Sequence, residues 1–103
     1  MVREISAEEL NPRKDTFVVK VTATWCGACK AIHPEYARLA SQYSNVGFAE
    51  IDADKNMEFV SNELGVKSLP TFLFYGGGQL VNKVVGNKPA ELRKGVDELS
   101  NSY

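Results

Sequence analysis

The hydrophobic residues of the chain follow two spacings, which predicts a mixture of strands and helices. Residues 17–22 are almost continuously apolar, a pattern typical of a central strand that is covered on both faces. Shorter apolar runs predict further strands at residues 46–52, 71–75 and 80–85. Because residues 76–78 are consecutive glycines, we expect the last two strands to pair as an antiparallel hairpin.

Helical spacing of apolar residues predicts one long amphipathic helix over residues 27–43. Its buried face would consist of Ile32, Tyr36, Leu39, Ala40 and Tyr43. Pro34 lies inside this segment, so we expect a kink about two turns from its start.

Three shorter helices are predicted from signals at their ends. Ser6 and Glu9 form a capping box that would open a short helix ending at Asn11-Pro12. Residues 56–64 would form a helix that the following glycine stops. Pro89 would open the last helix, and the apolar stripe of that helix would be Leu92, Val96 and Leu99.

These elements predict the fold class. With one strand ahead of the first helix, the order of elements is β-α-β-α-β-α-β-β-α. Parallel units followed by a hairpin and a covering helix predict an α/β fold with a central mixed β-sheet and helices on both faces. A chain of 103 residues without repeats or linkers predicts a single domain over residues 1–103.

Composition and charge narrow the possible functions. The apolar content of 44% and the charged content of 24% are ordinary for a globular protein. A net charge of −1 gives no basic footprint for nucleic acid or an anionic membrane. No apolar run approaches the roughly 18 residues that span a bilayer, and the first residues lack the apolar core of a signal peptide. We therefore expect a cytoplasmic protein without nucleic-acid or membrane partners.

The chemistry of the chain is concentrated in its two cysteines, Cys26 and Cys29. They lie between the expected central strand and the start of the long helix, where a helix N-terminus stabilises a thiolate. The thiolate is the reactive form in disulfide exchange, and two neighbouring thiols can close a disulfide on each other. This placement indicates thiol–disulfide exchange.

Three other uses of the cysteine pair are less favoured. A structural zinc site needs four ligands, whereas the chain offers two cysteines and the distant His33, which we expect to be an exposed helix residue. A structural disulfide across so short a loop would add little stability. Two unrelated buried cysteines would need neither the preceding Trp25 nor the following helix.

The motif Trp25-Cys26-Gly27-Ala28-Cys29-Lys30 is followed by Pro34 in the long helix and by Ser68-Leu69-Pro70-Thr71 before the hairpin. Together these residues resemble the thioredoxin family, and the resemblance covers essentially the whole chain. It implies the thioredoxin fold and the reduction of protein disulfides through a reversible Cys26–Cys29 dithiol.

The resemblance also implies roles for individual residues. Cys26 corresponds to the exposed attacking cysteine and Cys29 to the buried resolving cysteine. Pro70 corresponds to a proline that follows a cis peptide bond, which would place the backbone of Leu69 where it can pair with an extended substrate strand. The residues expected to contact the substrate are Trp25, Gly27, Ala28, Leu69, Pro70 and Gly86.

The implied reaction is a two-step exchange between thiols and a disulfide. Cys26 would attack a substrate disulfide, and Cys29 would then attack Cys26 to release the reduced substrate. The chain has no Gly-x-Gly-x-x-Gly motif, so we expect no bound cofactor or metal and a separate thioredoxin reductase-like enzyme as electron donor. The other partners would be disulfide-containing proteins, and the protein would be a monomer.

Three features depart from the family pattern, and one of them is Thr22 in place of a tryptophan that many bacterial members carry. Ala28 stands where a proline is usual, which would free a backbone N–H to stabilise the thiolate and make the couple more oxidising. The family usually has a buried Asp at the position of Lys20, paired with a lysine on the neighbouring strand. Here Glu50 occupies the position of that second lysine. We predict a buried ion pair with exchanged positions; the alternative is that Lys20 extends to solvent. Either Glu50 or a neutral Lys20 would accept the proton of Cys29.

Two other functions stay open from the sequence alone. The surface around Trp25, Leu69 and Gly86 would also suit a protein-binding module that is switched by its redox state. A disulfide oxidase or isomerase is mildly favoured by Ala28 and Lys20 through a higher potential, although the lack of a signal peptide argues against it.

Overall fold

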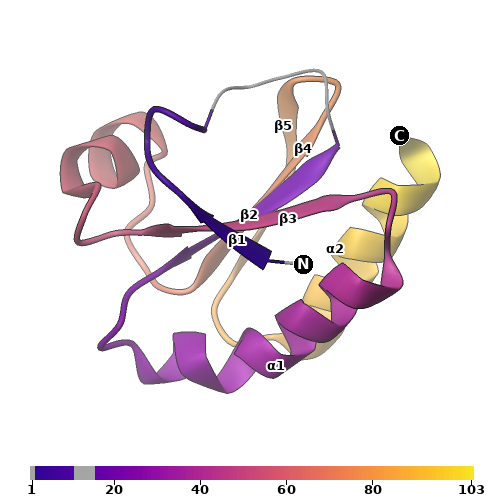
Figure 1. Ribbon diagram of the computed structural model, residues 1–103, viewed down its shortest axis with the longest axis horizontal. Coiled ribbons are helices and arrows are strands. Elements are labelled where there is room, and N and C mark those ends of the chain that lie inside the picture. The colour runs from indigo at the N-terminus through magenta and orange to yellow at the C-terminus, as the bar shows by residue number, and fades with distance from the viewer. Residues whose placement is uncertain (1, 11–15) are drawn as a thin grey trace.

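One five-stranded β-sheet forms the centre of the molecule, with the strand order β1-β3-β2-β4-β5 (Figure 1). The computed structural model describes residues 2–10 and 16–103. The strands are β1 (Val2–Ile5), β2 (Phe17–Thr22), β3 (Gly47–Asp52), β4 (Thr71–Gly76) and β5 (Gln79–Val85). The helices are α1 (Gly27–Gln42), the π-helix η1 (Phe59–Glu63) and α2 (Pro89–Ser102).

The sheet is mixed, as predicted. Strand β3 pairs in parallel with β1 and β2, whereas β4 pairs antiparallel with β2 and β5. β2 therefore lies in the middle of the sheet, and Val18, Val19 and Val21 on it are fully buried. Gly77 and Gly78 form the hairpin turn with positive φ angles of 62° and 83°, a conformation that residues with a side chain disfavour.

Helical segments cover both faces of the sheet (Figure 1). One face packs against α1 and α2, in a core that includes Tyr36, Phe72 and Phe74. The other face packs against η1 through Val60 and the nearby Val66. The predicted stripe of the last helix is confirmed by the burial of Leu92, Val96 and Leu99. Within the described ranges, no helix has the length and apolar content needed to cross a membrane.

The short helix predicted at Ser6 is wrong, although its capping contact forms. The Ser6 backbone N–H donates to Glu9 Oε1 at 3.1 Å, but only a single turn follows. One turn gains too few hydrogen bonds to offset the cost of nucleating a helix. The predicted end at Asn11-Pro12 lies outside the described residues. The opening strand of the predicted order is β1.

The helix predicted at residues 56–64 is confirmed, and Phe59–Glu63 within it form the π-helix η1. The Leu64 N–H donates to the carbonyl of Phe59 at 3.0 Å, a five-residue step that gives a wider turn. Gly65 follows with a φ of 65°, which confirms its predicted place after the helix end.

Tyr36 fastens α1 to the sheet. Helix α1 continues through Pro34, and the ring of Tyr36 is fully buried two residues later. Its hydroxyl lies 3.0 Å from the Val18 carbonyl of β2 and 2.7 Å from the Ala49 carbonyl of β3. Desolvation by burial raises the pKa of Tyr36 well above its ordinary value of 10.0, so the hydroxyl keeps the proton that it donates.

Replacing Tyr36 by Phe should lower the free energy of unfolding by about 1–2 kcal/mol, because two buried carbonyls lose a shared donor. The measurement is urea denaturation of the oxidised protein. Tyr43→Phe is the matched control, since the Tyr43 hydroxyl bonds to Asp97 at the surface at 3.0 Å and its loss should cost less than about 0.5 kcal/mol. Equal losses in the two variants would contradict the anchoring role of Tyr36.

Candidate functional site

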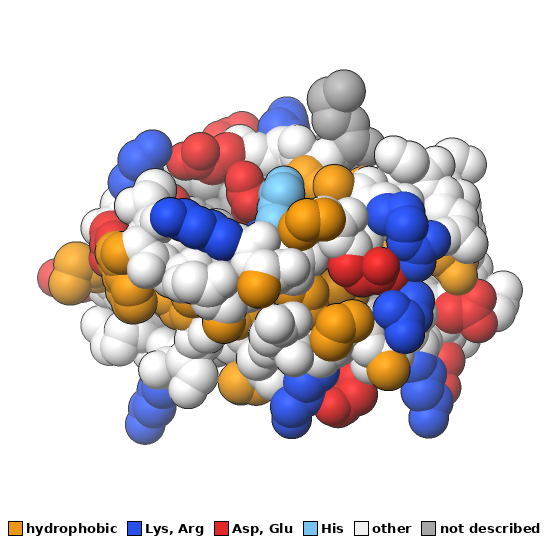
Figure 2. Space-filling model, turned by 90° about the horizontal axis from the view of Figure 1, so that it is seen from below, with side chains coloured by type: hydrophobic (Ala, Val, Ile, Leu, Met, Phe, Trp, Pro, Cys, Tyr) orange, Lys and Arg blue, Asp and Glu red, His pale blue; other side chains and the backbone are white. Residues whose placement is uncertain are grey.

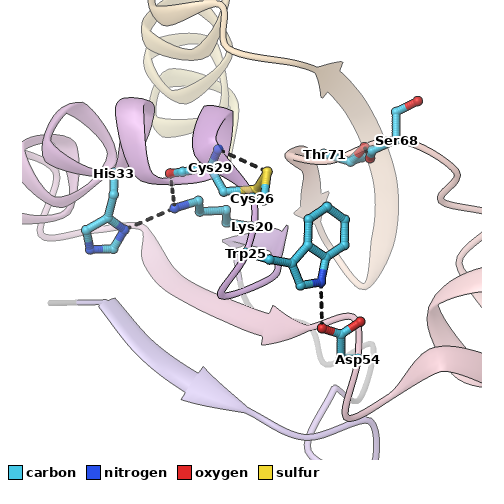
Figure 3. Close-up of a disulfide and its surroundings, with 8 residues drawn as sticks. All are labelled: Lys20, Trp25, Cys26, Cys29, His33, Asp54, Ser68 and Thr71. Carbon is cyan, nitrogen blue, oxygen red and sulfur yellow. Dashed lines mark hydrogen bonds between the residues drawn. A yellow bond between two sulfur atoms is a disulfide. The ribbon is translucent and has the colours of Figure 1, made fainter.

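The two cysteines form a disulfide at the start of α1 (Figure 3). Their Cα atoms are 5.2 Å apart. Cys26 is the N-cap of α1, and its sulfur accepts a hydrogen bond from the Cys29 backbone N–H at 3.2 Å. The predicted helix start is thus confirmed, and the sulfur of Cys26 lies at the positive end of the helix, where a thiolate is stabilised after reduction.

The donor to the sulfur is the N–H of Cys29, not the N–H of Ala28. The sequence suggested that alanine at this position frees an additional donor for the thiolate. Instead, the Cys29 N–H donates the hydrogen bond that Cys26 Sγ accepts. Cys29 is the third residue of α1, and the N–H of the third residue faces the N-cap side chain. In the oxidised form, therefore, no hydrogen bond from the Ala28 N–H to Cys26 Sγ supports the predicted effect of Ala28 on the redox potential.

The two cysteines face different surroundings. Cys26 is 6% exposed and Cys29 is 1% exposed. Both residues are buried in the oxidised form, and the residue predicted to attack is the more accessible of the two. Cys26 lines a groove of about 360 Å³ together with Trp25, Met57 and Leu69. Cys29 instead lines a pocket of about 260 Å³ on the other side of the turn.

The residues around the cis proline lie beside the disulfide, as predicted. The Leu69–Pro70 peptide bond is cis, and the half-buried Leu69 packs against Cys26 and Cys29. Gly86, with a φ of 97°, donates its backbone N–H to the Pro70 carbonyl at 2.8 Å. The fold thereby brings three predicted substrate-contact residues together from two separate segments.

Trp25 lies on the surface next to the disulfide. It is 68% exposed, and its indole Nε1–H donates to Asp54 Oδ2 at 2.7 Å (Figure 3). Gly27 and Ala28 are also exposed. Asp54 was not predicted as a site residue. It follows the carboxyl end of β3, next to the carboxyl end of the parallel strand β2, and this end of a parallel sheet is the usual place of functional side chains.

Lys20 lies beneath the first turn of α1 and is only 2% exposed. Its Nζ donates to the carbonyl oxygen of Cys29 at 2.9 Å and lies 3.1 Å from His33 Nδ1. The alternative that Lys20 extends to solvent is therefore wrong. Glu50 is its neighbour on β3, but no ion pair joins these two described side chains, so the predicted direct pair is wrong as well.

His33 stands between the two residues that were expected to pair. Its Nδ1 lies 3.9 Å from Glu50 Oε2, and its side chain is 42% exposed. From the sequence, His33 was expected to be an exposed helix residue. The signal it missed is spacing, because His33 follows Cys29 by four positions and so lies on the same face of α1.

Burial and charge act in opposite directions on Lys20. Desolvation by burial lowers the pKa of Lys20, and the nearby carboxylate of Glu50 partly raises it. The ammonium is therefore easier to deprotonate than an ordinary lysine.

Comparisons with known proteins place the chain among close relatives. The family model described as Thioredoxin matches residues 3–98. Thioredoxin Asp f 29 of Aspergillus fumigatus is 41% identical over 95 residues, which cover 90% of this chain and 86% of that protein. Thioredoxin H-type of Ricinus communis is 43% identical over 84 residues, which cover 82% of this chain and 70% of that protein.

Solved structures agree with the fold. The thioredoxin Mala s 13 of Malassezia sympodialis superposes with a TM-score of 0.86 at 30% identity, covering 97% of this chain and 91% of that one. The oxidised mitochondrial thioredoxin 3 of Saccharomyces cerevisiae gives a TM-score of 0.86 at 31% identity, covering 94% of each chain.

Replacing Lys20 by Met should raise the free energy of unfolding by about 1 kcal/mol or more at neutral pH, because a buried charge is exchanged for an apolar side chain of similar size. The sign of the pH dependence follows from the lowered pKa. The unfolded chain binds the lysine proton more tightly than the folded one, so wild-type stability rises with pH until the ordinary value of 10.5 is passed. The advantage of Lys20→Met should shrink over that alkaline window.

Urea denaturation of the oxidised proteins at neutral and alkaline pH measures this difference. Lys30→Met is the matched control, since Lys30 is an exposed lysine on α1 and its loss should change stability by less than about 0.5 kcal/mol. A loss of about 3–5 kcal/mol in Lys20→Met would contradict the expected balance and show that the two hydrogen bonds of Lys20 outweigh its desolvation.

Proposed function

The chain belongs to the thioredoxin family, and we propose that it works as a monomeric cytoplasmic electron carrier that is recharged by a separate reductase. Its family and its CxxC pair make it a thiol–disulfide oxidoreductase that reduces protein disulfides. The observation that carries this conclusion is the Cys26–Cys29 disulfide at the N-terminus of α1.

The proposed reaction proceeds in two exchange steps. The Cys26 thiolate attacks a substrate disulfide, forms a mixed disulfide and displaces one substrate thiolate. Cys29 then attacks Cys26 Sγ, which closes the internal disulfide and releases the second substrate thiolate. Two electrons pass from the dithiol to the substrate. The assignment of Cys26 to attack is supported by its N-cap position and by its greater exposure.

The proposed substrate surface surrounds the more exposed sulfur. Trp25 and Leu69 line the groove beside Cys26, and the exposed Met57 extends it toward η1. Gly86 is held next to the cis proline by its hydrogen bond to the Pro70 carbonyl. We expect an extended segment of a partner protein to lie along Leu69, where backbone hydrogen bonds would hold it. Gly27 and Ala28, both exposed, would contact the same segment.

The electron donor and the compartment are also part of the proposal. The chain carries no nucleotide-binding glycine motif, so a thioredoxin reductase-like enzyme would return the electrons without a cofactor bound to this chain. We assign the protein to the cytoplasm, although one relative, 36% identical, is named mitochondrial. Its substrates would be disulfide-containing proteins.

A disulfide oxidase or isomerase is the second candidate, and the buried Lys20 favours it. An ammonium near Cys29 stabilises the reduced, thiolate form of the couple, and such stabilisation makes a couple more oxidising. The equilibrium potential against glutathione distinguishes the two functions. We expect a couple more reducing than glutathione, whereas an oxidase would give a couple more oxidising than glutathione.

Cys26→Ser should abolish the reduction of insulin disulfides, and Cys29→Ser should accumulate mixed disulfides with protein substrates. Mass spectrometry after alkylation of the reduced wild-type protein at mildly acidic pH checks the order, because the N-cap thiolate of Cys26 should be labelled first. Faster labelling of Cys29 would overturn the assignment of roles. Binding of partners without any turnover by the wild type would favour the redox-switched binding module.

A further inference from the structure

Lys20 and His33 are within hydrogen-bond distance, and their chemistry allows this bond in more than one protonation state. The distance between Lys20 Nζ and His33 Nδ1 is 3.1 Å. An ammonium has only donors, so His33 Nδ1 accepts from Lys20 when the lysine is charged. A neutral amine has a lone pair, so Lys20 accepts from a protonated His33. A proton can therefore cross this bond without breaking it.

The same two residues connect the buried cysteine with the surface. Lys20, Cys29 and His33 line one pocket of about 260 Å³. Cys29 is 1% exposed and Lys20 is 2% exposed, whereas the His33 side chain is 42% exposed. In Figure 3 the Lys20 amine lies between the first turn of α1 and His33, and Figure 2 shows the histidine at the surface of the molecule.

The buried position of Cys29 creates a need for such a connection. Cys29 must lose its thiol proton before it attacks Cys26, because only the thiolate is nucleophilic. We propose that Lys20 and His33 form a proton relay that carries the thiol proton of Cys29 to solvent during this second exchange step. The inference rests on the proposed function, since it assumes that Cys29 is the resolving cysteine.

The proton and electron balance of the step is closed. The Lys20 ammonium passes a proton to His33 Nδ1, and His33 releases a proton to solvent from its other nitrogen. The neutral Lys20 amine then takes the proton of the Cys29 thiol across the pocket, and His33 returns to the tautomer with an unprotonated Nδ1 by exchanging protons with solvent. Cys29 Sγ bonds to Cys26 Sγ, the bond from Cys26 Sγ to the substrate sulfur breaks, and the substrate leaves as a thiolate.

The surroundings suit a relay better than a fixed charge. Burial makes the Lys20 ammonium readier to release a proton, and Glu50 limits this effect. An imidazole can accept a proton at one ring nitrogen and release one from the other. The other charged groups that line the pocket are Glu4 on β1, Glu50 and Asp52 on β3, and Lys30 on α1. The Tyr36 ring lies 6.0 Å from Lys20 Nζ on the remaining side.

A single-turnover experiment separates the two exchange steps. The reduced protein is mixed with a chromogenic aromatic disulfide, which releases one coloured thiolate when Cys26 attacks and a second when Cys29 displaces it. Stopped-flow absorbance from about pH 6 to about pH 9 gives the rate of each release around the range in which imidazole titrates. The second rate reports the deprotonation and attack of Cys29.

His33→Gln should slow the second release by about a hundredfold near neutral pH, at the low end of what a positioned acid–base group contributes. The rate should recover toward alkaline pH, where hydroxide removes the proton, and the first release should not change. Arg38→Gln is the matched control, because it removes an exposed basic side chain from the same helix and should leave both rates unchanged.

The double variant decides whether His33 acts through Lys20. Lys20→Met should slow the second release, and adding His33→Gln to it should slow the release no further, because the relay is already broken. Independent, multiplying effects would overturn the relay, as would a wild-type rate in His33→Gln at every pH. If the wild type released only one thiolate, the two-step exchange itself would be wrong, and the relay with it.

Discussion

Burial of β2 on both faces is the constraint on which the rest of the structure depends. β2 lies between β3 and β4 in the sheet, with helical segments over both of its faces (Figure 1). Every polar group on such a strand must find its partner inside the protein. The strand ends at Thr22, four residues before Cys26, so a strand that is buried on both faces also fixes where the reactive turn begins.

Lys20 shows how this constraint reaches the chemistry. Its ammonium finds an acceptor in the Cys29 carbonyl at 2.9 Å and a second partner in His33, which ties the middle of the sheet to the first turn of α1. A positive charge near a thiol favours the thiolate, whereas a carboxylate at the same place would disfavour it. Having Lys instead of Asp at this position therefore reverses the electrostatic effect on Cys29. It also replaces a carboxylate base by Lys20 and His33, which would transfer the proton to solvent.

Much of the fold could be predicted from the sequence because it depends on local spacing. The apolar positions of α1 and the glycines of the hairpin turn each follow a rule that operates within a few residues. The failure at Ser6 arises because a single turn gains too few hydrogen bonds to offset the cost of nucleating a helix. The cis bond before Pro70 was expected only from the family resemblance, since most X-Pro bonds are trans.

The site was less predictable than the fold, because its contacts depend on how different elements are placed. The sequence indicated that Lys20 and Glu50 are neighbours, and the register confirms it. It could not show that the Lys20 side chain turns toward α1, because that direction is set by the position of the helix over β2. His33 was undervalued for the same reason. Its four-residue spacing from Cys29 gave the face of α1, but only the packing of α1 showed that Lys20 lies under that face.

The disulfide separates two environments that suit two different steps. On one side, Cys26 lines an apolar groove with Trp25 and Leu69, where a partner protein can reach the sulfur. On the other side, Cys29 lines a pocket of charged and titratable groups that a partner covering the groove would leave open. Attack on a substrate needs contact area, whereas resolution needs an exit for a proton while the substrate is still attached. Placing the two sulfurs on one helical turn but in separate pockets allows both conditions to hold at once.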